Sequence, residues 1–171
     1  MKMNSPSFVH LDVNTQYSLG RSIIRQDQLI DACIDMNMPA FGVTDHNNLF
    51  SAYKLYKSSQ KKGIKYIIGS TVTILDQKER TKSKLLLLCE NEIGYKNLCA
   101  LITQSYTQGL DREEPLIDKQ WLKDCTDGLI AISSYESGYF QQSKSIDESL
   151  NLEKITSLQA LFPDRLFISI S

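Results

Sequence analysis

Histidine is scarce in this sequence, and an excess of either charge is missing. Two histidines occur among 171 residues, and 19 lysines and arginines face 20 aspartates and glutamates, giving a formal net charge of −1. A free-standing nucleic-acid-binding protein usually shows a basic excess, so this balance argues against that class. It does not exclude a domain carried by a larger nucleic-acid enzyme. The sequence also has no glycine-rich phosphate-binding loop.

Long apolar runs are missing as well. The longest, such as Leu85 to Cys89, have the length of a strand and are too short to span a membrane. Met1 to Ser7 lacks the basic region and the apolar run of a secretory signal. We therefore expect a cytoplasmic protein without a membrane partner.

The cysteines and serines give little sign of chemistry. The four cysteines have no CxxC spacing; they are Cys33, Cys89, Cys99 and Cys125. The first three lie among apolar residues, which indicates small buried thiols in a reducing compartment and argues against a disulfide or a zinc cage. Ser133-Ser134 has no histidine in a recognisable triad arrangement, which argues against a serine nucleophile.

Strand and helix patterns alternate along the chain. The expected strands cover residues 8–13, 40–44, 66–68, 71–75, 85–89, 128–133 and 166–170. The expected helices cover residues 29–36, 49–62, 93–106, 119–125 and 152–162, and polar residues 137–151 predict a loop with a frayed helix. Such alternation is typical of an α/β fold with a parallel sheet or barrel. No helix follows the last strand before Ser171, so we expect a fold truncated at its C-terminal end.

The helix expected before Gly63 has two contrasting faces. Its apolar face carries Leu49, Ala52, Tyr53 and Tyr56, and its wet face carries Lys54, Lys57, Lys61 and Lys62. Such a lysine run is usually a solvated helix face, although it can also contact a phosphate backbone. We expect the aromatic residues at helical spacings to belong to the core and not to stack on bases. These residues are Tyr53, Tyr56, Tyr95 and Trp121.

Imidazole and carboxylate groups occur together at two places in the sequence. His10 and Asp12 are two residues apart on an expected strand, so they share one face, and Asn14 continues the same spacing. Asp45-His46 follows another strand, and the carboxyl ends of strands carry the working residues of α/β barrels. This set suits zinc, manganese or iron, which could activate water for phosphate-ester hydrolysis. The structural alternatives are that Asp45 or a neighbouring asparagine caps the next helix, and that His10 is a half-buried strand residue.

A family resemblance adds to this interpretation. Phe8-Val9-His10-Leu11 followed by Tyr17-Ser18 resembles the opening of the PHP (polymerase and histidinol phosphatase) domain, and Val43-Thr44-Asp45-His46-Asn47-Asn48-Leu49 resembles its second motif. Gly94-Tyr95-Lys96-Asn97-Leu98 is similar to a stretch of the bacterial DNA polymerase III alpha subunit, as are Gly128 to Ser133 and Phe162 to Arg165. The resemblance is colinear over nearly the whole chain and favours the polymerase branch of the family.

The chain departs from the family at its metal ligands. Metal-competent members begin with His-x-His-x-His, where this chain has His10, Asp12 and Asn14. Further ligand positions of the family correspond here to Arg21, Thr71, Lys84 and Tyr135. A cation near such a site would repel a divalent ion by roughly 4 kcal/mol per pair at close range. The resemblance thus implies a vestigial metal site of His10, Asp12, Asp45 and His46, with no catalytic residue assigned. The later motifs of the family are expected beyond Ser171.

The resemblance also implies a fold and a role. Residues 1–171 are expected to form an incomplete, distorted β/α barrel at the N-terminus of a replicative polymerase, without its polymerase domain. The implied role is structural, and the implied partners are the rest of the alpha chain, the proofreading exonuclease subunit and, through the parent enzyme, DNA. No cofactor is expected in this chain, whereas the parent polymerase would use magnesium. The alternatives are a small phosphoesterase that uses manganese or zinc, and a stand-alone interaction module.

Overall fold

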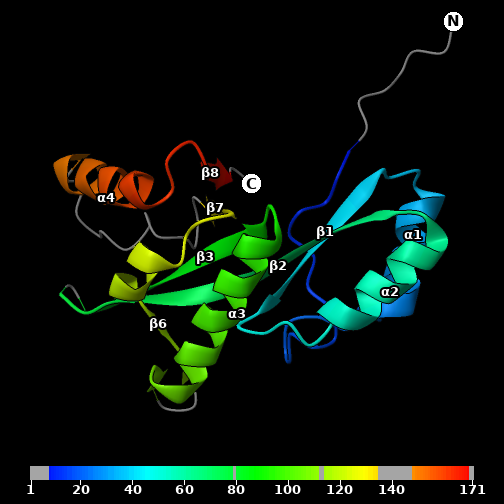
Figure 1. Ribbon diagram of the computed structural model, residues 1–171, viewed down its shortest axis with the longest axis horizontal. Coiled ribbons are helices and arrows are strands. Elements are labelled where there is room, and N and C mark those ends of the chain that lie inside the picture. The colour runs from blue at the N-terminus through cyan, green and yellow to red at the C-terminus, as the bar shows by residue number, and fades with distance from the viewer. Residues whose placement is uncertain (1–7, 79, 112–113, 135–147, 170–171) are drawn as a thin grey trace, which may run out of the picture. The chain divides into compact units, whose positions relative to one another are not determined.

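The computed structural model describes residues 8–78, 80–111, 114–134 and 148–169 (Figure 1). The chain divides into two compact units, residues 1–70 and residues 71–171. Strand β2 (Lys65–Asp76) runs from the first unit into the second. The predicted strands over 66–68 and 71–75 are therefore one continuous strand, and Gly69 and Ser70 lie buried inside it.

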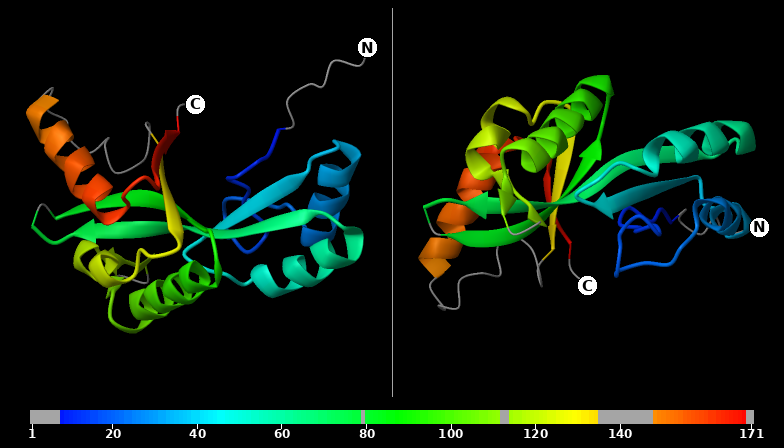
Figure 2. Two further views of the ribbon diagram at one scale, coloured as in Figure 1. Left: turned by 45° about the horizontal axis from the view of Figure 1, so that its top comes forward. Right: turned by 90° about the horizontal axis from the view of Figure 1, so that it is seen from below.

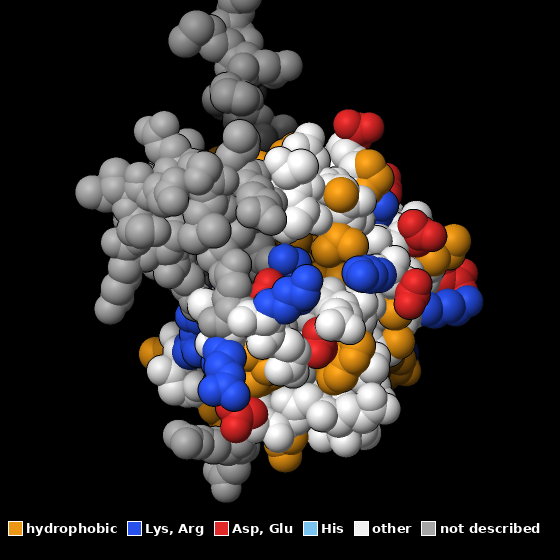
Figure 3. All heavy atoms as spheres, turned by 90° about the vertical axis from the view of Figure 1, so that its left-hand side faces the viewer, with side chains coloured by type: hydrophobic (Ala, Val, Ile, Leu, Met, Phe, Trp, Pro, Cys, Tyr) orange, Lys and Arg blue, Asp and Glu red, His pale blue; other side chains and the backbone are white. Residues whose placement is uncertain are grey.

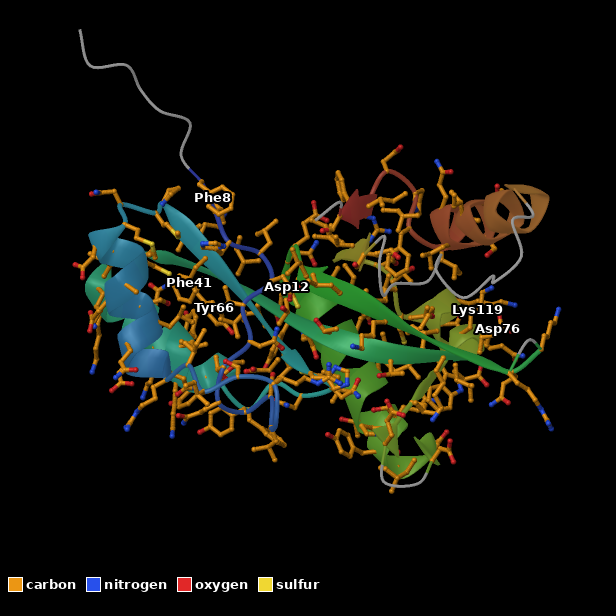
Figure 4. All side chains as sticks on the ribbon, turned by 180° about the vertical axis from the view of Figure 1, so that it is seen from behind. Phe8, Asp12, Phe41, Tyr66, Asp76 and Lys119 are labelled. Atoms are coloured by element: carbon orange, nitrogen blue, oxygen red, sulfur yellow. The ribbon has the colours of Figure 1, made fainter. Side chains whose placement is uncertain are left out.

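The first unit packs two helices onto strand β1. Helix α1 (Gln26–Asp35), strand β1 (Ala40–His46) and helix α2 (Ala52–Lys62) follow one another, and β1 is hydrogen-bonded to β2. Their shared core consists of Leu29, Ile30, Cys33, Phe41, Val43, Leu55 and Ile64. Phe41 stacks on Tyr66 at the edge of this core, with ring centroids 5.3 Å apart (Figure 4).

The ends of both helices agree with the sequence prediction. Asn37 adopts a left-handed backbone with φ 55° directly after α1, and the amide of Met38 returns to the carbonyl of Cys33 at 2.9 Å. Gly63 ends α2 with φ 70°, a conformation that glycine adopts without steric cost. The helix stops were predictable because they depend on local residues alone.

The strand expected over residues 8–13 is not regular. In place of a ladder, this segment has one isolated parallel bridge between Val13 and Val43. The amide of Gly42 donates to the carbonyl of His10 at 2.7 Å, and that of Thr44 donates to Val13 at 2.9 Å. The acceptors His10 and Val13 are three positions apart in the chain, but the donors Gly42 and Thr44 are only two positions apart. The N-terminal segment therefore carries an extra residue, as in a β-bulge. A Cβ at Gly42 would lie 3.1 Å from the backbone of Leu11, which explains why glycine accommodates the bulge there.

The second unit is built on a mixed sheet. Strands follow the order β2-β3-β7-β8, comprising β3 (Thr81–Cys89), β7 (Leu129–Ser134) and β8 (Leu166–Ser169), while β6 (Ile117–Asp118) also pairs with β2. β7 is antiparallel to β3 and parallel to β8. The α/β class is thus confirmed, but the sheet is mixed and not parallel throughout, since β3 pairs with β7 in the antiparallel sense. β3 follows β2 through the turn at Lys78 without the crossover helix that a parallel pair needs.

Helices cover both faces of this sheet. Figure 2 shows α3 (Glu92–Thr107) and α4 (Glu148–Leu161) on opposite faces, with the short 3-10 helix η1 (Lys119–Asp124) on the side of α3. The core between the layers includes Leu85, Leu87, Leu98, Leu101, Leu129, Leu158 and Phe162. The segment between α3 and η1 contains two short paired strands, β4 (Leu110–Asp111) and β5 (Glu114–Pro115).

Several predictions about side chains can now be compared with the structure. Tyr53, Tyr56 and Tyr95 are 67%, 53% and 39% exposed, so their assignment to the core is wrong, whereas Trp121 is half-buried. The four cysteines are free, with Cys33 buried and the others half-buried. Among the described residues, no helix is long and apolar enough to cross a membrane. Tyr135 and most of the expected loop over 137–151 lie outside the described residues.

Candidate functional site

Asp45 is the centre of a buried hydrogen-bond network in the first unit. It lies near the carboxyl end of β1 and is 1% exposed. Its Oδ1 accepts from the amide of Thr15 and from Oγ of Ser18, both at 2.7 Å, and its Oδ2 accepts from Oγ1 of Thr15 at 2.8 Å. A carboxylate offers about four lone-pair positions, and three are used here. The network holds the loop after the N-terminal segment against β1.

The backbone of Asp45 is fixed as well. Its carbonyl accepts from Oγ of Ser70 at 2.7 Å. Helix α2 begins only at Ala52, and its N-cap residue Ser51 makes no side-chain cap. Asp45 therefore does not cap the helix, and that alternative is wrong. Asn48 stabilises the turn before the helix: its Oδ1 accepts from the amide of Phe50 at 3.1 Å.

His46 faces a cation. Its Nε2 lies 3.4 Å from a terminal nitrogen of Arg21 and 3.3 Å from Nδ2 of Asn47. A guanidinium only donates hydrogen bonds and keeps its charge, so Nε2 meets it with its lone pair. A metal ion bound at Nε2 would need that same lone pair. Arg21, which corresponds to a ligand position of the resembled family, thus lies next to the imidazole.

His10 and Asp12 make separate contacts. The His10 ring is exposed and packs edge-on against Phe8, with ring centroids 4.7 Å apart. Asp12 is exposed and accepts from Oγ1 of Thr44 at 2.7 Å (Figure 4). Successive side chains of a strand point to opposite faces, so Thr44 and the Asp12 bound to it lie across β1 from the Asp45 carboxylate.

The position of His10 along β1 also separates it from Asp45. Its carbonyl pairs with Gly42, three residues before Asp45, which corresponds to roughly 10 Å of strand. The structure therefore brings Asp45, His46 and Arg21 together and places His10 and Asp12 apart from them. Within the described residues, no group of three or more His, Cys, Asp or Glu side chains could hold a metal ion.

The remaining positions of the resemblance are spread over the chain. Asn14 is half-buried, with Oδ1 3.0 Å from Oγ of Ser18. Thr71 and Lys84 belong to β2 and β3 of the second unit. Sequence reasoning missed the hydroxyls of Thr15 and Ser18 as partners of Asp45. Neighbouring hydroxyl residues are common in loops, and no spacing rule marks these two.

The Gly94-Tyr95-Lys96-Asn97-Leu98 stretch has a structural role in the second unit. Oδ1 of Asn91 caps α3 by accepting from the amide of Gly94 at 3.1 Å. A Cβ at Gly94 would lie 1.8 Å from the carbonyl oxygen of Gly128, so glycine allows the first turn of α3 to contact that backbone. Nδ2 of Asn97 donates to the carbonyl of Asp127 at 2.9 Å, and Leu98 is fully buried. The stretch thus fixes α3 to the turn before β7.

Comparison with solved structures agrees with this architecture. A crystallised protein from Bifidobacterium adolescentis, provisionally assigned as a metal-dependent phosphoesterase, superposes on the chain with a TM-score of 0.64. The match covers 98% of this chain and 77% of that protein, at 9% sequence identity. At that identity the similarity concerns the fold alone, and it is consistent with a partial β/α barrel.

Sequence comparison identifies the family. DNA polymerase III alpha subunits of Buchnera aphidicola and Pseudomonas aeruginosa are each 33% identical to the chain, over 98% and 96% of its length. The Escherichia coli K12 alpha subunit is 31% identical over 98%. The chain spans about 15% of the length of these relatives. The PHP domain model matches residues 10–171, and the chain therefore belongs to the PHP domain family.

Proposed function

We propose that this chain acts as the PHP domain of a DNA polymerase III alpha subunit, with a structural role and without phosphoesterase activity. The observation that carries the proposal is the 33% identity to alpha subunits over nearly the whole chain. The side-chain geometry of the first unit supports the loss of catalysis.

Three features speak against metal-dependent chemistry at this site. The carboxylate of Asp45 is committed to Thr15 and Ser18. The lone pair of His46 at Nε2 meets a guanidinium. Asp12 is bound to Thr44 across the strand. The residues that remain do not fit a divalent ion, which needs several converging oxygen or nitrogen donors and no neighbouring cation.

The parent enzyme would add deoxynucleotides to a primer in the cytoplasm, using magnesium and carboxylates outside these 171 residues. The rest of the alpha chain would be the covalent neighbour of this domain, and DNA would be reached through the parent enzyme. The proofreading exonuclease subunit would dock on the domain. These roles are implied by the family resemblance and are part of the proposal.

A small metal-dependent phosphoesterase is the competing function. It is favoured by the retention of Asp45 and His46 side by side at the end of β1. The two functions predict different outcomes when purified protein is incubated with manganese or zinc and a chromogenic phosphodiester. We expect the wild type, Asp45→Asn and His46→Ala to be equal to the metal-only blank. Turnover by the wild type that Asp45→Asn abolishes would contradict the structural role.

The docking role is tested separately. Size-exclusion chromatography of the chain with the exonuclease subunit encoded in the same genome should give a co-eluting complex. Arg21→Ala should leave this complex intact, because the Arg21 guanidinium lies beside His46 of the vestigial site. Separate elution of the two proteins at micromolar concentration would contradict the docking role.

A further inference from the structure

Helix α2 carries an outward face of tyrosines and lysines. Tyr53, Lys57 and Lys61 follow one another at intervals of four residues, and Tyr56 and Gln60 lie beside them, so all five project from one side of the helix. All five are exposed. We refer to these five residues as the α2 face.

The α2 face does not serve the core. The buried residues of the helix are Ala52, Leu55 and Ser59, on its other side. Tyr53 and Tyr56 were expected in the core, yet 67% and 53% of their surfaces remain accessible. Two large aromatic rings that bury little surface contribute little to folding. They remain available to a ligand.

The charge of the helix is one-sided. Its sequence contains four lysines and no acidic residue, in a chain whose net charge is −1. Lys62 pairs with Asp31 on another side of the helix. Lys54, Lys57 and Lys61 form no ion pair with any residue that the structure describes. Lys57 and Lys61 are four residues apart and repel one another, while Lys61 in the last turn also interacts favourably with the helix dipole.

Lysine and tyrosine are also combined locally. Nζ of Lys57 lies 5.0 Å from the centroid of the Tyr53 ring, within cation–π range. Figure 3 shows the face at the left-hand side of Figure 1, where acidic and basic side chains are intermixed. That face differs from α2, which has lysines but no acidic residue. The α2 face instead joins unpaired positive charge to flat aromatic rings.

We propose that the α2 face binds single-stranded nucleic acid. Bases would stack on Tyr53 and Tyr56, and Lys57 and Lys61 would contact the phosphates, the combination that typifies sequence-tolerant single-strand binding. An anionic membrane is the weaker match, because insertion needs an aliphatic helix face and that of α2 is buried in the core. The proposal goes beyond the structural role proposed above and holds or fails independently of it.

Fluorescence anisotropy tests the proposal with the 171-residue chain and a labelled oligothymidylate. We expect saturable binding at low salt, with a dissociation constant of about 1–100 μM. The variant Tyr53→Ala/Tyr56→Ala should weaken binding about five-fold or more, because it removes both stacking surfaces. Lys57→Gln/Lys61→Gln should lower the slope of log K against log salt by about 1.4, since each phosphate contact on a single strand contributes about 0.7.

Matched variants separate the α2 face from general charge. Lys62→Gln removes one lysine from the same helix but lies outside the α2 face, and Tyr106→Ala removes a tyrosine that is 46% exposed on α3. Both should bind like the wild type. The variants change exposed side chains, and circular dichroism will verify that each is folded. The proposal would be overturned if anisotropy did not change at about 100 μM protein. It would also be overturned if the tyrosine variant kept the wild-type affinity, or if the matched variants lost as much affinity as the variants of the α2 face. Tighter binding to vesicles of anionic lipid than to the oligonucleotide would overturn it too.

Discussion

The guanidinium of Arg21 lies 3.4 Å from Nε2 of His46, one of the two ring nitrogens through which an imidazole can bind a metal ion. A neighbouring buried carboxylate, Asp45, has both oxygens engaged by Thr15 and Ser18. Asp45 and His46 are the two residues that most resemble a metal site in the sequence. His46 contacts a cation, and Asp45 accepts hydrogen bonds from neutral donors. The hydrogen bonds of Asp45 tie the loop that carries Thr15 and Ser18 to β1 in the first unit.

The first prediction concerns Asp45. Replacing it by asparagine puts an amide group against donors that now bind a carboxylate oxygen, so at least one buried donor loses its acceptor. We expect Asp45→Asn to lower the free energy of unfolding by about 2–3 kcal/mol. Urea denaturation followed by circular dichroism measures it.

Asp12→Asn is the matched control, because Asp12 is exposed and the asparagine oxygen can still accept from Thr44. Its loss should stay below about 1 kcal/mol. Equal losses for the two variants would mean that the Asp45 network does not stabilise the protein.

The second prediction concerns the contact of α3 with the turn before β7. Gly94→Ala places a Cβ 1.8 Å from the carbonyl oxygen of Gly128, so one of the two backbones must move. We expect a loss of about 2–3 kcal/mol of unfolding free energy, the range of an overpacked core. The comparison variant Gly63→Ala meets no atom within 4 Å and bears only the strain of φ +70°. It should cost about 1 kcal/mol, and an equally mild Gly94→Ala would contradict the close contact.

The third prediction compares two lysines of the second unit that form ion pairs. Nζ of Lys119 lies 3.1 Å from Oδ2 of Asp76, and the side chains are only 25% and 12% exposed (Figure 4). Lys119→Ala should cost about 2 kcal/mol, because it leaves a largely buried carboxylate without this cation. Lys82 pairs with Asp111 and Glu114 at 3.0 Å but is 39% exposed, so Lys82→Ala should cost less than about 1 kcal/mol. Thermal unfolding ranks the two variants, and the reverse order would refute this assignment.

The fourth prediction concerns thiol reactivity. Burial, with a smaller contribution from Cys99, raises the pKa of Cys89 to about 12. The thiolate is the form that reacts with iodoacetamide, and at pH 8 only about one Cys89 side chain in ten thousand is a thiolate. Its labelling rate should rise about ten-fold per pH unit from pH 8 to 10, whereas cysteines in urea should level off above about pH 9. Mass spectrometry of the labelled peptides gives the rates, and early labelling of native Cys89 would contradict its burial.

Local signals in the sequence predicted much of the fold. The ends of α1 and α2 depend on Asn37 and Gly63, and each was placed within a residue or so. The strand before Asp45-His46 and the helix after Asn91 were also predicted, because apolar spacing and capping residues mark them. These features are decided within a few residues of chain.

Features that depend on tertiary partners were not predictable. Periodicity placed Tyr53 on the buried face of α2, but Ala52, Leu55 and Ser59 are the buried residues of that helix. The alternation at residues 8–13 predicted a regular strand, yet the extra residue over Gly42 breaks the ladder. Likewise, residue spacing did not reveal that Asp45 would bind two hydroxyls from a loop thirty positions away.

The measurement that tests the central claim most directly is the binding of manganese and zinc to the purified chain, by equilibrium dialysis and elemental analysis. We expect no stoichiometric metal binding by the wild type, and we expect Asp45→Asn to bind the same amount of metal as the wild type. Arg21→Glu should bind more metal than the wild type, because it removes the cation from His46 and supplies a carboxylate. Stoichiometric binding by the wild type that is lost in Asp45→Asn would contradict the account.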